Sequence, residues 1–173
     1  VSRFPHLSNL YIFKIQYQKT TKKLCFWTKK AILFYMKLVL KNINCFFNER
    51  LHISCNDAPC LDSSWHYHPQ YELLYMSKSK GIRFVGDSVA PFTEGDLVLV
   101  GSNLPHLWRN DPSYYREQND EHVQTVVIKF MNDFLGKDTF EQPQFLGINH
   151  MLEQSKFGLS FGRNVSKNLH NDL

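Results

Sequence analysis

The stretch WHYHPQYELLYM, residues 65–76, decides how this chain is interpreted. His66, His68 and Glu72 are two and four residues apart, so all three side chains point to the same face of a strand. On a helix the two histidines would diverge, and Pro69 would interrupt the helical hydrogen bonds. The stretch is therefore predicted to be a strand or strand edge that aims two imidazoles and a carboxylate at one side of a sheet.

Short apolar runs separated by turn residues extend along the chain on both sides of this stretch. The runs are MKLVL (36–40), YELLYM (71–76), IRFVG (82–86), LVLVG (97–101), LPHLW (104–108) and VQTVVIKF (123–130). A hairpin-like connection is expected at SKSKG (77–81), and tighter turns at GDS (86–88) and at Glu94-Gly95-Asp96. This regular spacing is typical of an all-β barrel or sandwich.

The pattern becomes helical after Phe130. A first helix is predicted over residues 132–140, where Asn132 or Asp133 can cap it. A second is predicted within residues 143–158, beginning at a proline and ending at a glycine. The chain is therefore expected to be a barrel followed by helices.

The charge is unevenly distributed. Residues 1–45 carry nine Lys or Arg and no acid, whereas the remaining chain has 11 basic and 16 acidic residues. Residues 1–35 also lack a sustained hydrophobic period, so they are predicted to be a basic extension, untranslated or disordered in the natural protein, with Met36 as its first residue. A basic arm for nucleic acid or membrane and a poorly folded extension are the alternatives. The part predicted to fold is acidic and would repel phosphates.

Cysteines and apolar runs indicate the compartment. The four cysteines form no CxxC pair, which argues against a structural zinc site. Free thiols in a reducing cytoplasm are expected, with a bridge between Cys55 and Cys60 as the alternative in an oxidising compartment. The most apolar run, AILFYMKLVL (31–40), is shorter than the roughly 20 residues that cross a bilayer. The chain is therefore predicted to be cytoplasmic, with no membrane partner.

A further histidine, His106, follows the LVLVG run. Three neutral imidazoles and one carboxylate suit a divalent transition metal such as Zn, Fe, Mn, Ni or Cu. The candidate metal ligands are therefore His66, His68, Glu72 and His106. The alternative, hydrogen-bonded structural histidines, stays open.

These residues resemble the two sequence motifs of the cupins. The matching positions are His66, His68, Glu72, Gly81, Gly95, His106 and Asn110. The chain departs from the motifs at Cys60, which stands where they begin with glycine, at Gly81, which comes two residues late, and at residues 101–103, which replace a Pro-x-Gly turn. The departures put metal-dependent catalysis in doubt more than the fold.

Three longer segments resemble the sensing domains of AraC-type regulators. They are FVGDSVAPFTEGDLVLVGSNLPHLWRND (84–111), VVIKFMNDFLGKDTF (126–140) and PQFLGINHMLEQSKFGLSF (143–161). The resemblance implies a mainly β fold, with a cupin-like (jelly-roll) β-barrel over residues 36–130 and C-terminal helices over 131–161 that pair two protomers. Residues 162–173 are then a tail, and the DNA-binding domain of such regulators is missing.

The function expected from this resemblance is a small-molecule-sensing and dimerisation domain, not an enzyme. Its effector would be a small molecule such as a sugar, its partner a second copy of the chain, and DNA would be reached only through the missing C-terminal domain. The predicted ligand-binding residues are Trp65, His66, His68, Glu72, His106 and Trp108, and no catalytic residue is assigned. The alternatives are a free-standing metal-dependent cupin enzyme, a dioxygenase or a sugar isomerase, and an inert fragment.

The remaining polar and aromatic residues leave two further expectations. Arg83 and Arg109 either pair with an anionic ligand or simply solvate strand faces. Tyr71, Leu73 and Tyr75 have the opposite parity from Glu72, so they are predicted to pack outside the barrel, against helices or a second protomer.

Overall fold

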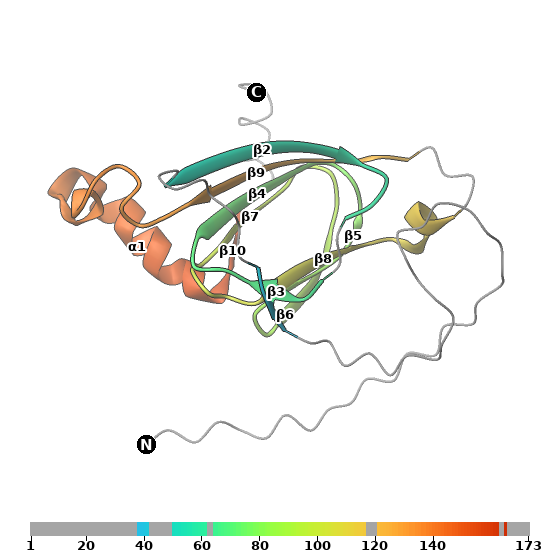
Figure 1. Cartoon of the computed structure of the whole chain (residues 1–173), viewed down its shortest axis with the longest axis horizontal. Helices are drawn as coiled ribbons and strands as arrows, with labels where there is room; N and C mark the ends of the chain where they lie inside the picture. Colours follow the sequence, from blue (N-terminus) through green and yellow to red (C-terminus); the bar gives the residue numbers. More distant parts are fainter. Residues whose placement is uncertain (1–37, 42–49, 62–63, 117–120, 163–164, 166–173) are drawn as a thin grey trace, which may run out of the picture. The chain divides into compact units, whose positions relative to one another are not determined.

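A computed structural model of the chain describes residues 38–41, 50–61, 64–116, 121–162 and 165, and its strands form two five-stranded sheets (Figure 1). In order across the first sheet, the strands are β1 (Val39–Leu40), β3 (His66–Tyr67), β8 (His106–Asn110), β5 (Gly81–Val85) and β6 (Ser88–Phe92). Across the second they are β10 (Leu159–Ser160), β7 (Asp96–Val100), β4 (Tyr71–Lys78), β9 (Val123–Phe130) and β2 (Leu51–Ala58). The predicted mainly β, cupin-like jelly-roll barrel followed by C-terminal helices is thus confirmed.

The chain crosses repeatedly from one sheet to the other. The SKSKG segment does not make a hairpin, because β4 pairs with β7 and β9 whereas β5 pairs with β6 and β8. The turns at Gly86 and Gly95 occur as predicted, and both glycines have the positive φ that side chains disfavour (58° and 81°). Each crossing places successive segments on opposite walls of the barrel.

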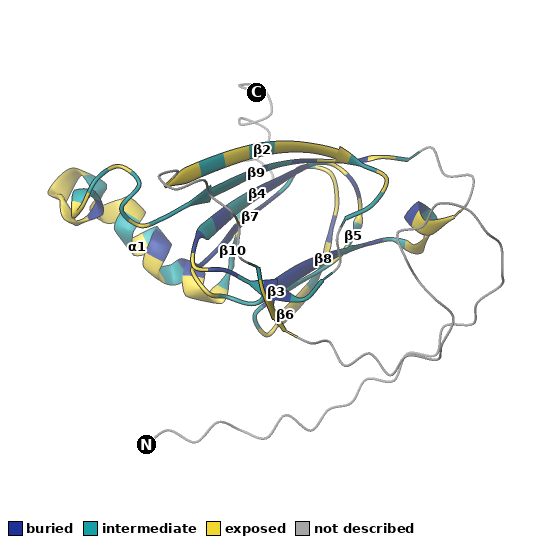
Figure 2. Ribbon diagram, in the orientation of Figure 1, coloured by how far each residue is buried: buried dark blue, intermediate teal, exposed yellow. Residues whose placement is uncertain are grey.

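Alternate residues of the strands fill the barrel interior. Buried stretches of the strands are dark blue in Figure 2. The buried interior cluster consists of Leu74, Met76, Val85, Phe92, Val98, Val100, Trp108, Tyr114, Val123 and Val127. A second apolar cluster lies on the outer face of the second sheet, where Tyr71 and Leu73 pack around Leu99, Phe140 and Leu152. The outward packing predicted for Tyr71 and Leu73 is therefore confirmed, and the covering residues come from the C-terminal segment.

The C-terminal segment is only partly as predicted. The helix α1 (Leu146–Gln154) lies within residues 143–158, flanked by the 3-10 turns η3 (Pro143–Phe145) and η4 (Ser155–Phe157). No helix spans 132–140, where turns precede the 3-10 turn η2 (Thr139–Glu141). Gly136 and Asp138 have φ of 114° and 60°, which a right-handed helix cannot accommodate.

Two strands of the second sheet were not predicted. β10 returns from the C-terminal segment to pair with β7, which fastens that segment to the barrel. The eight-residue β2 pairs with β9 along its whole length and forms the sheet edge. Its alternating Leu51 and Ile53 side chains are exposed, so they lack the burial that the other runs share.

Several predictions fall outside the described residues. These include the basic extension over 1–35, the start at Met36, Cys25 and Cys45, and most of the tail over 162–173. One further 3-10 turn, η1 (Pro112–Tyr115), lies in the connection between β8 and β9. Within the described part of the chain, no helix is long and apolar enough to cross a membrane.

Candidate metal centre

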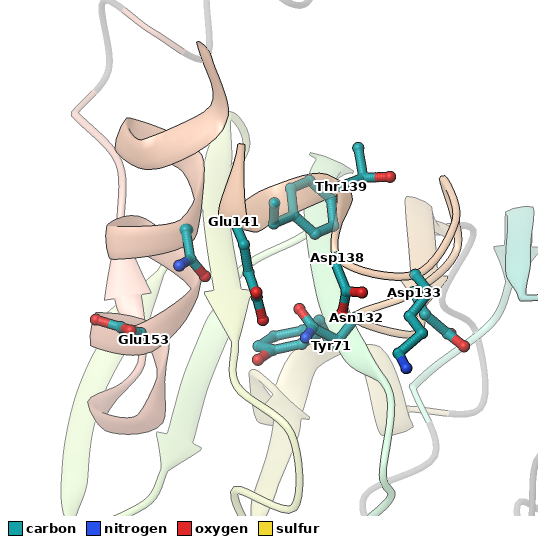
Figure 3. Close-up of a pocket in the computed structure, with 10 residues that line it drawn as sticks. Tyr71, Asn132, Asp133, Asp138, Thr139, Glu141 and Glu153 are labelled. Carbon is teal, nitrogen blue, oxygen red and sulfur yellow. The ribbon is translucent and has the colours of Figure 1, made fainter. Parts of the chain in front are cut away.

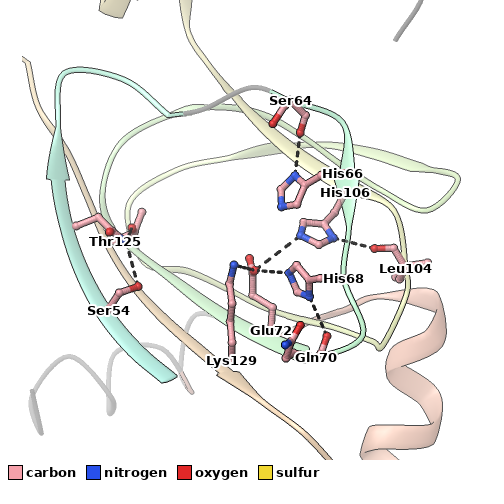
Figure 4. A network of polar contacts seen from close by, with 11 residues as sticks. Ser54, Ser64, His66, His68, Gln70, Glu72, Leu104, His106, Thr125 and Lys129 are labelled. Atoms are coloured by element: carbon pink, nitrogen blue, oxygen red, sulfur yellow. Dashed lines mark hydrogen bonds and ion pairs between the residues drawn. The ribbon is translucent and has the colours of Figure 1, made fainter. Parts of the chain in front are cut away.

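The candidate ligands come from both walls of the barrel. In the first sheet, His66 of β3 lies directly opposite His106 of β8, and their ring centroids are 4.3 Å apart. In the second sheet, Glu72 of β4 lies directly opposite Lys129 of β9. His68 lies between the two strands that supply His66 and Glu72, and Figure 4 shows all of these side chains converging.

The prediction that one strand carries His66, His68 and Glu72 on a single face is wrong. β3 ends at Tyr67, the chain bends at residues 69–70, and β4 then begins in the other sheet. Pro69 has no amide hydrogen to donate to a sheet ladder, which explains why the strand does not continue. The side chains nevertheless meet, because the bend turns them toward each other across the barrel.

The three imidazoles are held in the same way. His66 Nδ1 is 2.8 Å from the carbonyl oxygen of Ser64, His68 Nδ1 is 3.1 Å from that of Gln70, and His106 Nδ1 is 2.7 Å from that of Leu104. A carbonyl oxygen can only accept a hydrogen bond, so each Nδ1 carries the hydrogen. In each neutral ring, Nε2 is therefore the atom with a free lone pair.

The four ligand groups are suited to a metal ion. One ligand atom from each of His66, His68, Glu72 and His106 can be chosen so that all lie within 4.8 Å of one another, and all four residues are buried. Opposite ligands of a metal with bonds of about 2.1 Å are about 4.2 Å apart, so loading requires only a small contraction.

Two imidazole Nε2 atoms point at the same oxygen of the Glu72 carboxylate. His68 Nε2 is 3.0 Å from Glu72 Oε2, and His106 Nε2 is 3.7 Å from the same oxygen and has no hydrogen-bond partner among the described residues. An imidazolium at His68 would satisfy only the first of these contacts. A cation at the centre satisfies all of them, and backbone carbonyls that orient imidazoles are typical of metal sites.

Glu72 is the charged focus of the cluster. Burial by itself raises the pKa of its carboxyl, but His106, His68 and the Lys129 ammonium hold that pKa well below its usual value. The Nζ atom of Lys129 is 3.0 Å from Glu72 Oε2. Glu72 is therefore a carboxylate, the form that binds metals.

Sequence reasoning missed Lys129. A signal was present, because Lys129 shares its parity in VQTVVIKF with Val123, Thr125 and Val127, the residues that face the interior. A lysine at an inward position of an apolar strand destabilises the fold unless its charge is paired, because its ammonium group is removed from water.

The predicted ligand-binding tryptophans and the two arginines do not all lie at the histidine cluster. Trp108 lies inside the barrel, its ring centroid 5.7 Å from that of His106, and its buried Nε1 has no hydrogen-bond partner among the described residues. Trp65 directly precedes β3 and is partly exposed, so its role stays a prediction. Arg83 pairs with Asp96, and Arg109 lies over the ring of Phe84. These contacts favour the interpretation in which both arginines serve the strand faces.

The acid stability of the metal-free protein is expected to depend on His66. Burial, followed by the neighbouring His106, lowers the pKa of His66 from 6.5 to about 4. Between these two pH values the unfolded chain binds a proton that the folded chain excludes, so stability falls as the pH drops from about 6.5 to about 4. Denaturant unfolding at several pH values in the presence of a chelator measures this loss. The variant His66→Asn, which keeps a donor near the Ser64 carbonyl, should lose less stability over the same range, and an equal loss would exclude His66 as its source.

A hollow of about 410 Å³ lies outside the barrel (Figure 3). Its lining includes Tyr71, whose parity is opposite to that of Glu72, and the acidic residues Asp133, Asp138, Glu141 and Glu153. It is therefore separate from the histidine cluster.

No protein-family model and no curated protein sequence matches the chain. Solved structures do resemble it. A Cupin 2 conserved barrel domain protein from Salinispora arenicola is 20% identical with a TM-score of 0.39, over 54% of this chain and 71% of that one. ToxT from Vibrio cholerae is 12% identical with a TM-score of 0.46, over 70% of this chain and 46% of that one. An unsaturated fatty acid bound form of ToxT is 15% identical with a TM-score of 0.37, over 51% of this chain and 32% of that one.

The matched part of this chain thus spans less than half the length of either ToxT chain. These values describe resemblance of fold and carry no information about ligand or activity. The assignment of the barrel rests on its own strands and their register.

Proposed function

We propose that the barrel binds a divalent transition metal and acts as the small-molecule-sensing domain of an AraC-type regulator. The observation that carries the metal proposal is the shared orientation of the three imidazoles. Each Nδ1 lies within hydrogen-bonding distance of a backbone carbonyl oxygen, which leaves Nε2 of His66, His68 and His106 as the ring atoms that can bind a metal together with Glu72. The metal would be held by these four residues and would supply a Lewis acid to which a ligand oxygen can bind.

The sensing role rests on the resemblance of residues 84–111, 126–140 and 143–161 to AraC-type sensing domains. In this role, a sugar hydroxyl would bind the metal, and Trp108 would supply an aromatic face and a buried N–H donor that has no partner among the described residues. Dimerisation through the C-terminal helices and action on DNA through a further domain belong to the same proposal.

A metal-dependent cupin enzyme is the second candidate. It is favoured by the four-ligand set itself, because an octahedral metal with four protein ligands keeps two positions open for substrate. The same cluster would then act on its ligand as well as bind it.

Thermal unfolding of the metal-loaded protein with a panel of aldopentoses and aldohexoses separates the two candidates. The sensor is expected to show a saturable rise in melting temperature with one sugar, since a ligand that binds only the folded state stabilises it. Trp108→Phe, which keeps an aromatic face but removes the N–H donor, should reduce that rise. Isomerisation of the sugar by the wild-type protein, lost in His66→Ala, would instead establish the enzyme, and no shift with any sugar would refute a sugar sensor.

A further inference from the structure

Lys129 is not one of the candidate metal ligands, but its ammonium group contacts one of them, Glu72. Its side chain is 17% exposed, and β9 places it on the same barrel-facing side as the apolar interior residues Val123 and Val127. Removing an ammonium group from water is unfavourable unless it is paired. The described structure gives the Nζ atom one ion-pair partner, Glu72.

The same carboxylate oxygen serves both the ammonium and the imidazoles. Oε2 of Glu72 lies 3.0 Å from Lys129 Nζ, 3.0 Å from His68 Nε2 and 3.7 Å from His106 Nε2. A metal ion bound to this oxygen would stand a few ångströms from a second positive charge. Repulsion between two cations at that range is strong where water is excluded.

We propose that Lys129 competes with the metal for Glu72 and thereby sets the metal affinity of the site. This inference rests on the metal binding proposed above. In metal-free protein, the Lys129 ammonium neutralises the Glu72 carboxylate in place of the metal. Metal binding requires the Lys129–Glu72 ion pair to separate. The free energy needed to separate the pair opposes metal binding and lowers the affinity of the site.

The chemistry of lysine suits such a role. Its ammonium is a compact charge on a flexible four-carbon stem, which can turn toward water without moving the backbone. The residual exposure of Lys129 indicates a route by which its end group can leave the carboxylate. Glu72, in contrast, is fixed between two paired strands, β7 and β9, and stays in place for the metal.

Titration of the metal-free protein with Zn²⁺ and with Mn²⁺, using isothermal calorimetry and a competing chelator, tests the proposal. Lys129→Met should bind metal about tenfold or more tightly than the wild type, because the competing cation is gone. Lys129→Arg keeps the charge and should not show this gain. Lys78→Met makes the same replacement at an exposed position on the neighbouring strand β4 and should leave the affinity unchanged.

The outcomes distinguish this inference from the metal proposal beneath it. If neither the wild type nor Lys129→Met binds either metal, the metal site itself is refuted. If both bind with equal affinity, the site stands and the competition is refuted. In a Glu72→Gln background the replacement of Lys129 should raise the affinity less, since only direct repulsion remains and competition for the carboxylate has been removed, and a gain of the same size there would overturn the mechanism.

Discussion

Replacement of His106 by asparagine is expected to abolish tight binding of divalent transition metals. Asparagine can still donate to the Leu104 carbonyl in place of Nδ1, but it removes the Nε2 lone pair. Loss of a residue that only orients a ligand typically weakens metal binding about 10–100-fold, so loss of a ligand should exceed that range. Metal content after dialysis and calorimetric titration both measure the effect.

The matched control for this variant is His122→Asn. His122 is exposed, pairs with Asp57 and does not belong to the four-ligand cluster, so its loss should leave metal binding unchanged. Circular dichroism checks that His106→Asn remains folded, since His106 is only 1% exposed. A folded His106→Asn protein with wild-type metal affinity would exclude the histidine cluster as the metal centre.

The spacing of the histidines along the sequence is enough to predict that they form a cluster with Glu72. It is not enough to place those residues on strands, because the bend at Pro69 transfers the chain from β3 in one sheet to β4 in the other. The parity rule describes a continuous strand, and a proline within the motif ends that continuity. The four residues meet because His66, Glu72 and His106 lie on the interior sides of their strands, and the connection between β3 and β4 carries His68 to the same place.

For Lys129, the strand position could be predicted from the sequence, but the contact could not. Its parity could be recognised from residues 123–130 alone, but its partner could not. The pairing of Lys129 with Glu72 depends on the register between β4 and β9, which are separated by more than 40 residues of chain. Register is set by long-range packing, and a slip of one residue would turn Lys129 to the other face.

The outer elements were predicted unevenly for physical reasons. α1 has a proline before it and a glycine after it, which are local signals. β2 lacks the apolar burial that identifies a strand from its sequence, and its stability comes from pairing with β9. The helix expected over 132–140 was wrong because Gly136 and Asp138 adopt left-handed conformations, which the capping pattern did not reveal.

Replacement of Glu72 by methionine is expected to destabilise the metal-free barrel by about 3 kcal/mol. The change leaves the partly buried Lys129 ammonium without its carboxylate, and it removes the oxygen that lies 3.0 Å from His68 Nε2. Breaking a buried ion pair by removing one partner usually costs about 3–5 kcal/mol. The lower end applies because the lysine stem can carry its charge partly toward water.

The double variant Glu72→Met/Lys129→Met gives the decisive comparison. Replacing both members of a buried ion pair with apolar side chains of similar volume is often neutral, so the double variant should recover most of the lost stability. Lys129→Met alone should also be destabilised in metal-free protein, because it leaves the carboxylate without its ammonium. Urea unfolding in the presence of a chelator, followed by circular dichroism, measures all three free energies of unfolding. If the two single losses simply add in the double variant, Glu72 and Lys129 are not energetically coupled, and the ion pair does not stabilise the metal-free protein.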